Sequence, residues 1–265
     1  MNTLFIRLYG PFQAWGLRAR WTYRDTALEP TKSGVIGLLA CCLGWGVPEN
    51  AQIRALSRAF RYGVRVDRPG RLLRDYHTVF GGVRSAEGRI KFTATTKEPE
   101  TVVSERYYLC DASFLAVLQV KEDADLAFLD VQTVGEAVER CATALRAPAW
   151  PPYLGRRACV PSVPLYAGME QYATLEDALK EPQPSSHPNS NVNLDADLFP
   201  REDASAPVRA VLECPPTAQR GSRRPDEIES LVHRLYAPRF AEDVLLPIMT
   251  PPAEGSQGAF WEDAL

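Results

Sequence analysis

The first segment of the chain alternates between two kinds of position. Residues 3–9 place aliphatic side chains at every second position, and Arg7 lies between Phe5 and Tyr9 at the positions in between. A period of two is typical of a β-strand. The pattern therefore predicts a strand with one face against a core and an arginine–aromatic face open to a ligand.

Three helices are predicted farther along. Residues 33–46 are apolar on nearly every side, which indicates a buried helix capped by Thr31 or Ser33. Residues 50–60 have an amphipathic period, and Thr133 with Glu136 forms a capping-box pattern before a helical stripe that ends at Leu145. Inside the first helix, Gly34 and Gly37 cost helix propensity, so we expect a backbone or a ligand to approach them closely.

The β-like segments between these helices complete a recognisable order. Residues 61–66 predict a short strand, and residues 72–80 and 90–97 predict a protruding hairpin with a glycine-containing tip. Residues 105–120 become fully apolar, as one central strand would, and a last strand is expected near 158–166. The order fits an α+β, ferredoxin-like sheet with helices on one face and an inserted arm.

Composition limits the class of protein. Hydrophobic residues make up 45% and charged residues 24% of the 265 residues, which are values of a globular protein. The start lacks a signal-peptide pattern, and the longest apolar run, Val35 to Gly46, is too short to span a bilayer. The six cysteines show no paired spacing, which favours reduced thiols and a cytoplasmic location. With three histidines and no cysteine pair nearby, neither a metal site nor another cofactor is expected.

Charge is distributed unevenly between the two parts of the chain. Residues 1–110 hold 17 Lys and Arg against 9 Asp and Glu, a balance of +8, and residues 111–265 hold 13 against 24, a balance of −11; together they give the net charge of −3. The arginines in front stand beside aromatic residues: Arg18, Arg20, Trp21, Tyr23, Arg24, Arg74, Tyr76, His77, Arg106, Tyr107 and Tyr108. This combination suits single-stranded nucleic acid. An ordinary solvated face is the alternative, and composition alone does not separate the two.

Two short motifs near the front could contact RNA directly. Gln13 offers an amide to a base edge and Trp15 a stacking plane, although Trp15 could equally fold into the core. Lys32, Ser33 and Gly34 begin a helix whose free N–H groups and dipole would favour a phosphate, although simple capping by Ser33 is the alternative.

Four segments together resemble a known family. They are GPFQAWG (10–16), PTKSGVIGLLACCLG (30–44), LRDYHTVFG (73–81) with RYYLCDASF (106–114), and YLGRRAC (153–159). In this order they resemble the CasD-type subunits of the fifth Cas protein family in type I-E CRISPR Cascade, over roughly residues 1–170. The resemblance implies a non-catalytic, RRM-like subunit that grips the 5′ handle of the crRNA and caps the Cascade backbone. It also implies a thumb-like hairpin, contacts with the backbone subunit CasC and the large subunit CasA, and target DNA bound through the assembled complex.

This resemblance also implies a domain organisation. Residues 1–175 would form the RRM-like domain, with the thumb at about 72–98, and residues 176–265 a Pro/Ser-rich linker and C-terminal extension. Within the extension, residues 208–214 predict a strand and 225–236 a helix. Phe260 and Trp261 in the tail are hypothesised to bury against a neighbouring subunit.

Alternation and the resemblance together give the candidate RNA contacts. Arg74, Tyr76 and Thr78 would share one face of the arm, with Asp75 and His77 on the other. Arg106 is the strongest single candidate, and Tyr108 would share its face. Gly155 would let a phosphate approach the backbone beside Arg156 and Arg157. The full set is Gln13, Trp15, Arg20, Tyr23, Lys32, Ser33, Gly34, Arg74, Tyr76, His77, Thr78, Arg106, Tyr108, Gly155, Arg156 and Arg157.

Two alternatives stay open. Related subunits of the type I-C branch process precursor crRNA as metal-independent endoribonucleases, and His77, Tyr23, Tyr76 and Lys32 are raw material for that chemistry. The QAWG and RDYHTV motifs instead point to the I-E branch, where a separate subunit cuts. A pure assembly subunit, whose basic half meets acidic proteins, is the other alternative.

Overall fold

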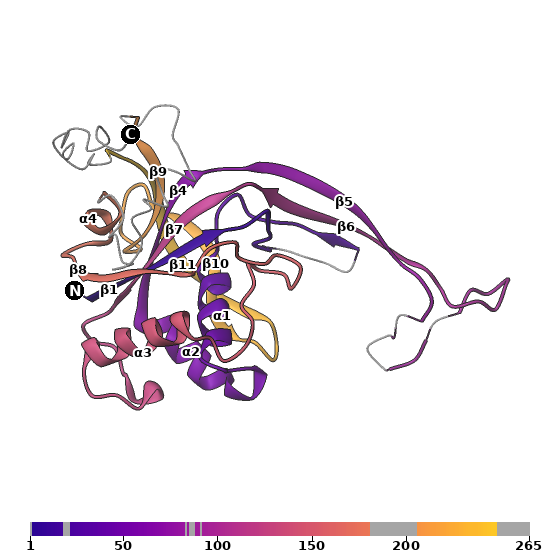
Figure 1. Cartoon of the computed structure of the whole chain (residues 1–265), viewed down its shortest axis with the longest axis horizontal. Helices are drawn as coiled ribbons and strands as arrows, with labels where there is room; N and C mark the ends of the chain where they lie inside the picture. Colours follow the sequence, from indigo (N-terminus) through magenta and orange to yellow (C-terminus); the bar gives the residue numbers. More distant parts are fainter. Residues whose placement is uncertain are drawn as a thin grey trace, which may run out of the picture.

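The computed structural model describes residues 2–17, 22–82, 84, 88–90, 92–180 and 206–247. These residues form a mixed α+β fold with two β-sheets (Figure 1). The larger, seven-stranded sheet has the order β10-β11-β9-β4-β7-β1-β8, and its neighbouring strands are antiparallel. Its strands are β1 (Asn2–Tyr9), β4 (Phe60–Arg68), β7 (Ser113–Val120), β8 (Tyr166–Gln171), β9 (Val208–Cys214), β10 (Ser222–Ser230) and β11 (Leu235–Leu246).

The helices cover the two faces of this sheet unequally. Helices α1 (Lys32–Cys42), α2 (Asn50–Ala59) and α3 (Val134–Arg146) pack with the strands into the main hydrophobic core. Two short 3-10 helices, η1 (Val47–Glu49) and η2 (Ala127–Leu129), accompany them. On the opposite face, the short helix α4 (Leu175–Lys180) takes part in a second, smaller hydrophobic cluster.

Because both faces of the large sheet are covered, one prediction about β1 has to be corrected. The expectation that Phe5 and Arg7 lie on an open face is wrong, because Phe5 is fully buried in the α4 cluster and Arg7 is 8% exposed. The ring of Phe5 packs edge-on against Tyr172 at 5.7 Å. Strands covered on both faces read as nearly continuous apolar runs, and only Arg7 interrupts such a run from Leu4 to Tyr9.

Three of the four predicted helices are present as α1, α2 and α3, together with two of the predicted caps. Thr31 is the N-cap of α1, and its hydroxyl accepts a hydrogen bond from the Gly34 N–H. The capping box of Thr133 and Glu136 is present at α3. Backbone N–H groups donate to the Glu136 carboxylate and lower its pKa. The close neighbour of Gly34 is the Trp15 side chain and not the predicted backbone or ligand, and a Cβ at Gly37 would meet open space, so that prediction is wrong at both glycines.

The second sheet forms an arm that curves away from the core (Figure 1). Its long strands β5 (Arg71–Val79) and β6 (Val102–Cys110) pair along their whole length, and short strands β2 (Phe12–Gln13) and β3 (Tyr23–Arg24) add to β6 at the base. The predicted hairpin partner 90–97 is wrong, since its described residues form only isolated bridges. The predicted single strand 105–120 is two strands, β6 and β7, separated by a turn with Asp111 in the left-handed region (φ 54°).

The C-terminal strands join the same large sheet. Strand β9, predicted at 208–214, pairs with β4 through Gly63 to Arg65. The predicted helix over 225–236 is wrong, because residues 222–230 form β10 and β11 follows after a turn. Burial there alternates with a period of two, with Asp226 and Ile228 inward. The hypothesis about Phe260 and Trp261, and the Pro/Ser-rich stretch from 181 to 205, lie outside the described residues.

The described part of the chain contains no single helix long and apolar enough to cross a membrane. The segments Lys32–Cys42 and Val47–Ala59 meet length and composition criteria only as a pair bent by 120°.

Candidate nucleic-acid interface

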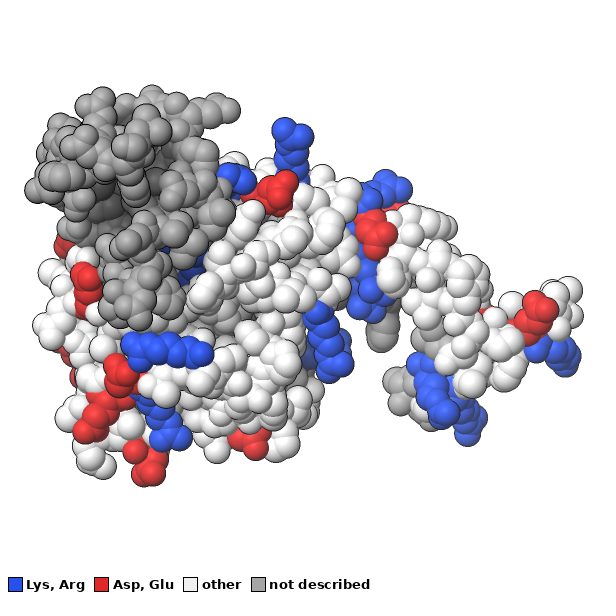
Figure 2. All heavy atoms as spheres, in the orientation of Figure 1, with Lys and Arg blue, Asp and Glu red and all other residues white. Residues whose placement is uncertain are grey.

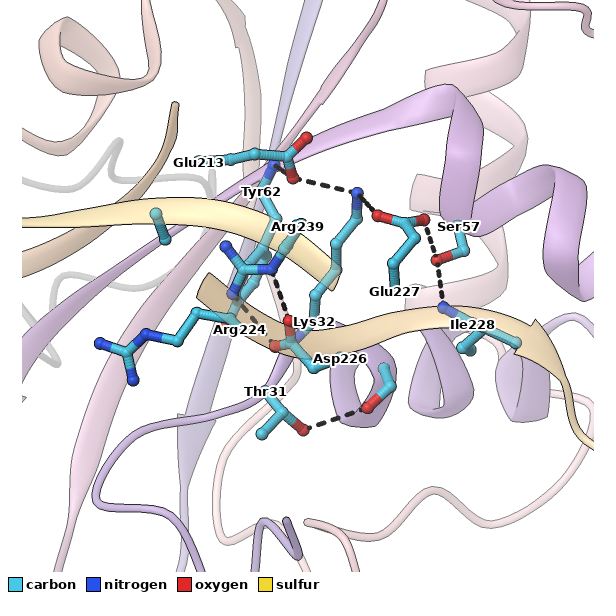
Figure 3. A network of polar contacts seen from close by, with 12 residues as sticks. Thr31, Lys32, Ser57, Tyr62, Glu213, Arg224, Asp226, Glu227, Ile228 and Arg239 are labelled. Carbon is cyan, nitrogen blue, oxygen red and sulfur yellow. Dashed lines mark hydrogen bonds and ion pairs between the residues drawn. The ribbon is translucent and has the colours of Figure 1, made fainter. Parts of the chain in front are cut away.

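The N-terminus of α1 lies against the C-terminal strands, where buried charges join the two (Figure 3). The Lys32 side chain is fully buried, and its Nζ lies 3.0 Å from Glu213 Oε2 and 2.6 Å from Glu227 Oε2. The second oxygen of Glu227 accepts a 2.5 Å hydrogen bond from Ser57 Oγ. Lys32 is therefore neutralised inside the protein, so the prediction that it binds RNA is wrong.

A carboxylate of the same chain also occupies the predicted phosphate position. The backbone N–H of Lys32 donates to Asp226 Oδ2 at 2.8 Å, and Arg239 holds both oxygens of Asp226 at 2.7 and 3.1 Å (Figure 3). Anions favour helix N-termini because unpaired N–H groups and the helix dipole meet there. The physical argument for an anion was sound, but the anion is Asp226. Ser33 and Gly34 lie in the same first turn, behind the Thr31 cap.

Two further predicted contacts are internal. Gln13 is fully buried, and its Nε2 donates to the carbonyls of Leu8 and Ala112 at 3.0 and 2.8 Å. Its Oε1 accepts from the indole N–H of Trp15 at 3.0 Å, and Trp15 is 1% exposed. Trp15 fills the space above Gly34, where a Cβ would lie 2.7 Å from its ring. The prediction that Gln13 and Trp15 read RNA is therefore wrong, and the core alternative for Trp15 holds.

Gly155 serves the fold in the same way. Its φ is +87°, and a Cβ on it would lie 1.8 Å from the carbonyl oxygen of Ala14. The glycine is required for the close passage of two protein segments. The prediction that Gly155 lets a phosphate approach the backbone is therefore wrong, because the close neighbour is Ala14 of the same chain.

The arm divides the remaining candidates between its two faces. In the β5–β6 register, Arg74 stands opposite Tyr107 and Asp75 opposite Arg106. Side chains of directly opposite residues share a face, and neighbours along a strand alternate. One face, called the arginine face, carries Asp75, His77, Ser104, Arg106 and Tyr108, joined by Arg24 of β3; the other, called the tyrosine face, carries Arg74, Tyr76, Thr78, Glu105 and Tyr107, joined by Tyr23.

Cations gather at the base of the arginine face. The guanidinium of Arg156 lies 4.7 Å above the Tyr108 ring and donates to the carbonyls of Tyr107, Arg24 and Asp25 at 3.0–3.2 Å. Arg106 donates to Ser104 Oγ at 3.1 Å. Among the residues that the structure describes, no carboxylate forms an ion pair with Arg106 or Arg156.

The electrostatics of Arg24 reflect this concentration of charge. Partial burial, and then repulsion by Arg106 and Arg156, lower the pKa of the Arg24 guanidinium. Like charges brought close together repel one another, so an anion placed beside Arg106 and Arg156 would be favoured. Arg157 continues this surface; it is exposed and forms no hydrogen bond or ion pair with a described residue. Figure 2 shows Lys and Arg side chains along the arm and where the arm meets the core.

The tyrosine face is closer to neutral. The rings of Tyr23 and Tyr107 pack at 5.1 Å, and their hydroxyl contact raises the pKa of Tyr107. Arg74 lies 3.3 Å from Glu105, so its charge has a partner. Tyr76 projects into solvent at 66% exposure. The structure therefore separates Arg74, Tyr76 and Thr78 from Arg106 and Tyr108, which share a face as predicted.

Of the remaining candidates, one lies on the arginine face and one lies outside the described residues. His77 Nδ1 lies 3.4 Å from Asp75 Oδ2 on the arginine face, which is the orienting pair that their spacing suggested. Arg20 lies outside the described residues. Phe12 packs its ring against Tyr108 at 5.9 Å, and sequence reasoning did not select it or Arg24. For Arg24, its place beside Tyr23 in the basic loop was the available signal.

Known proteins are similar to this chain in sequence and in architecture. The family model described as "CRISPR-associated protein (Cas_Cas5)" matches residues 3–227. The CRISPR system Cascade subunit CasD of Escherichia coli (strain K12) is 35% identical over 189 residues, covering 68% of this chain and 77% of CasD. A chain from a "CRISPR RNA-guided surveillance complex" superimposes with a TM-score of 0.64 at 28% identity, covering 93% of this chain and 90% of that one. A structure described as "Crystal structure of Cas protein" gives 0.60 at 31%, covering 94% and 100%. The chain therefore belongs to the Cas5 family of CRISPR-associated proteins and is a homologue of CasD.

Proposed function

We propose that this protein is a non-catalytic crRNA-binding subunit of a type I-E CRISPR Cascade surveillance complex. It holds the 5′ handle of the guide RNA on the arginine face of its arm and caps the backbone of the complex. The observation that carries the proposal is the group of Arg24, Arg106 and Arg156, gathered around Tyr108 with no ion-paired carboxylate on Arg106 or Arg156 among the described residues.

This arrangement has the chemistry that a single RNA strand requires. Guanidinium groups provide charge and planar donors for phosphates, and Tyr108 and Phe12 offer ring surfaces beside them. Arg156 is fixed by three carbonyls, so its position does not have to be organised when RNA arrives. A preorganised cation loses less conformational freedom on binding than a mobile one.

The core supports a finer description of the fold. We propose that β1, β4, β7 and β8 form a ferredoxin-like, RRM-like unit. Its support is the chain order strand, helices, strand, strand, helix, strand, together with the spatial order β4-β7-β1-β8 and antiparallel pairing. The arm is inserted between β4 and β7, and β9 to β11 extend the sheet beyond β4.

The proposed partners follow from the homology to CasD. They are the crRNA 5′ handle, the backbone subunit CasC, the large subunit CasA and, through the assembled complex, target DNA. The excess of Asp and Glu in residues 111–265 would suit basic protein neighbours better than nucleic acid.

The ribonuclease alternative finds its components in three places. His77 lies on the arginine face, Tyr23 and Tyr76 belong to the tyrosine face, and Lys32 is buried with two glutamates. General acid–base cleavage needs these groups within hydrogen-bond reach of one substrate position. Their separation supports the non-catalytic proposal.

One experiment tests RNA binding and the non-catalytic role together. The purified chain is incubated in EDTA with the repeat RNA of its own CRISPR array, and binding and products are followed on native and denaturing gels. We expect a salt-sensitive complex and intact RNA. Specific cleavage that His77→Ala abolishes would establish the ribonuclease instead. Absence of any complex, together with purified Cascade whose handle crosslinks to another subunit, would refute the binding proposal.

A further inference from the structure

The turn between β10 and β11, residues 231–234, forms an exposed basic and aromatic tip together with Leu235 and Tyr236 at the start of β11. All of its residues except Leu231 are exposed, including Val232 at 59%, Leu235 at 53% and Tyr236 at 44%. Its Arg234 side chain makes no hydrogen bond or ion pair with a described residue. The tip lies beyond residue 227, where the match to the Cas5 family ends. The match to the family model therefore does not include the tip.

The tip is anchored to the core and presents Arg234 from a strained position. The Leu231 N–H donates to Asn50 Oδ1 at 2.7 Å, and Ser230 Oγ accepts from the His233 N–H at 3.2 Å. Arg234 has a φ of 52°, in the left-handed region that glycine and asparagine adopt more readily. The fold therefore holds an arginine at a position where a turn alone would favour glycine.

The tip also lies toward the arginine face. In Figure 1 the β10–β11 hairpin passes α1 and α2 toward the side of the core from which the arm projects, and its end is held at Asn50, the first residue of α2. Arg234 is among the cations whose repulsion lowers the pKa of Arg24, after burial, Arg106 and Arg156. Arg234 thus adds positive charge to the field of that cluster, although it belongs to an otherwise acidic part of the chain.

We propose that the β10–β11 tip is a further binding element for single-stranded RNA, in which Arg234 contacts a phosphate and Tyr236 offers a ring to a base. The tip would contact the RNA strand where that RNA leaves the arginine face. Proteins that bind single-stranded nucleic acids without sequence preference combine cationic side chains for the phosphates with aromatic rings for the bases. This inference rests on the proposed function, because it needs RNA on the arginine face.

The test measures binding of the full chain to fluorescent repeat RNA across a salt series. Arg234→Ala should weaken binding about fivefold and make the slope of log K against log salt shallower by about 0.7, the value for one phosphate of a single strand. Tyr236→Ala should weaken binding to a similar degree with the slope unchanged. Arg220→Ala is the matched control, since Arg220 is an exposed arginine in the β9–β10 loop, at the opposite end of β10.

Arg234→Gly separates the ligand role from a structural one. Relief of the left-handed strain should raise the melting temperature by about 2 °C, while RNA binding falls as it does for Arg234→Ala. Equal binding by Arg234→Ala, Arg220→Ala and the unchanged chain would overturn the inference. If Arg106→Ala still weakened binding in that case, the proposed function would stand without the tip. An unchanged chain that fails to bind RNA would overturn both.

Discussion

Two groups of cations in this protein are built in opposite ways. At the start of α1, Lys32 and Arg239 are buried, and each contacts carboxylates, Lys32 through Glu213 and Glu227 and Arg239 through Asp226. At the base of the arm, Arg106 and Arg156 contact a hydroxyl, carbonyls and a ring. In the first group each cation has a carboxylate partner, and the group joins the C-terminal strands to the core. The second retains unneutralised charge at a surface.

The difference teaches which positive charges are available for a ligand. Burying an ion without a partner costs several kcal/mol, so a buried lysine requires its carboxylates. A carbonyl or a ring orients a guanidinium without cancelling its charge, so Arg156 keeps its attraction for phosphate. Counting basic residues does not distinguish these situations. The partners of each cation do.

The largest expected effect comes from breaking the buried group. Lys32→Met should lower the free energy of unfolding by about 3 kcal/mol, because the largely buried carboxylates of Glu213 and Glu227 would lose the cation that lies between them. Urea unfolding followed by tryptophan fluorescence measures this loss. The RNA affinity of the fraction that stays folded should not change.

An exposed ion pair provides the control for that prediction. Arg58 lies 2.7 Å from Glu229, and both side chains are well exposed. Arg58→Ala should cost less than about 1 kcal/mol, as surface pairs usually do. Equal losses for Lys32→Met and Arg58→Ala would mean that the buried network does not hold the C-terminal strands in place.

The opposite result is expected on the arginine face. Arg106→Ala should weaken binding to the repeat RNA about tenfold, through loss of a charge-assisted contact, and make the salt slope shallower. The melting temperature should stay within about 1 °C, because Arg106 is tied to the protein by one hydrogen bond to Ser104. A large drop in stability with unchanged RNA affinity would place Arg106 in the structural group instead.

Local structure could be predicted from local sequence. The N-cap at Thr31 and the capping box of Thr133 and Glu136 depend on residues three positions apart, and both are present. The predicted helix over 225–236 fails because its residues pair with a strand and cover α1, which the segment itself does not record. Tertiary pairing overrides weak local preference at such positions.

The candidate site could be predicted only in part, for the same reason. Arg106 and Tyr108 were placed together because two residues along one strand fix their face. Whether Arg74 joins them depends on the β5–β6 register, and the partner strand was expected at 90–97 instead of 102–110. The carboxylates of Lys32 lie 181 and 195 residues away in the chain, beyond any spacing rule.

Arg156 has features of both groups, which makes it a sharper test of the comparison. Arg156→Lys keeps the positive charge but removes the planar fork that holds three carbonyls. We expect a loss of about 1 kcal/mol in unfolding free energy with a nearly unchanged salt slope of RNA binding. An unchanged stability combined with a shallower slope would show that Arg156 acts on RNA alone.

The smallest effect is expected on the tyrosine face, where it should have the opposite sign. Glu105 lies 3.3 Å from Arg74 and neutralises it. Glu105→Gln removes that carboxylate, so Arg74 gains unneutralised charge and RNA affinity should rise by a factor of about two, the scale of an exposed ion pair. Arg74→Ala should change affinity less than Arg106→Ala does. If Arg74→Ala instead matched Arg106→Ala, RNA would contact both faces of the arm, and an ion pair with Glu105 would not be enough to remove an arginine from the binding surface.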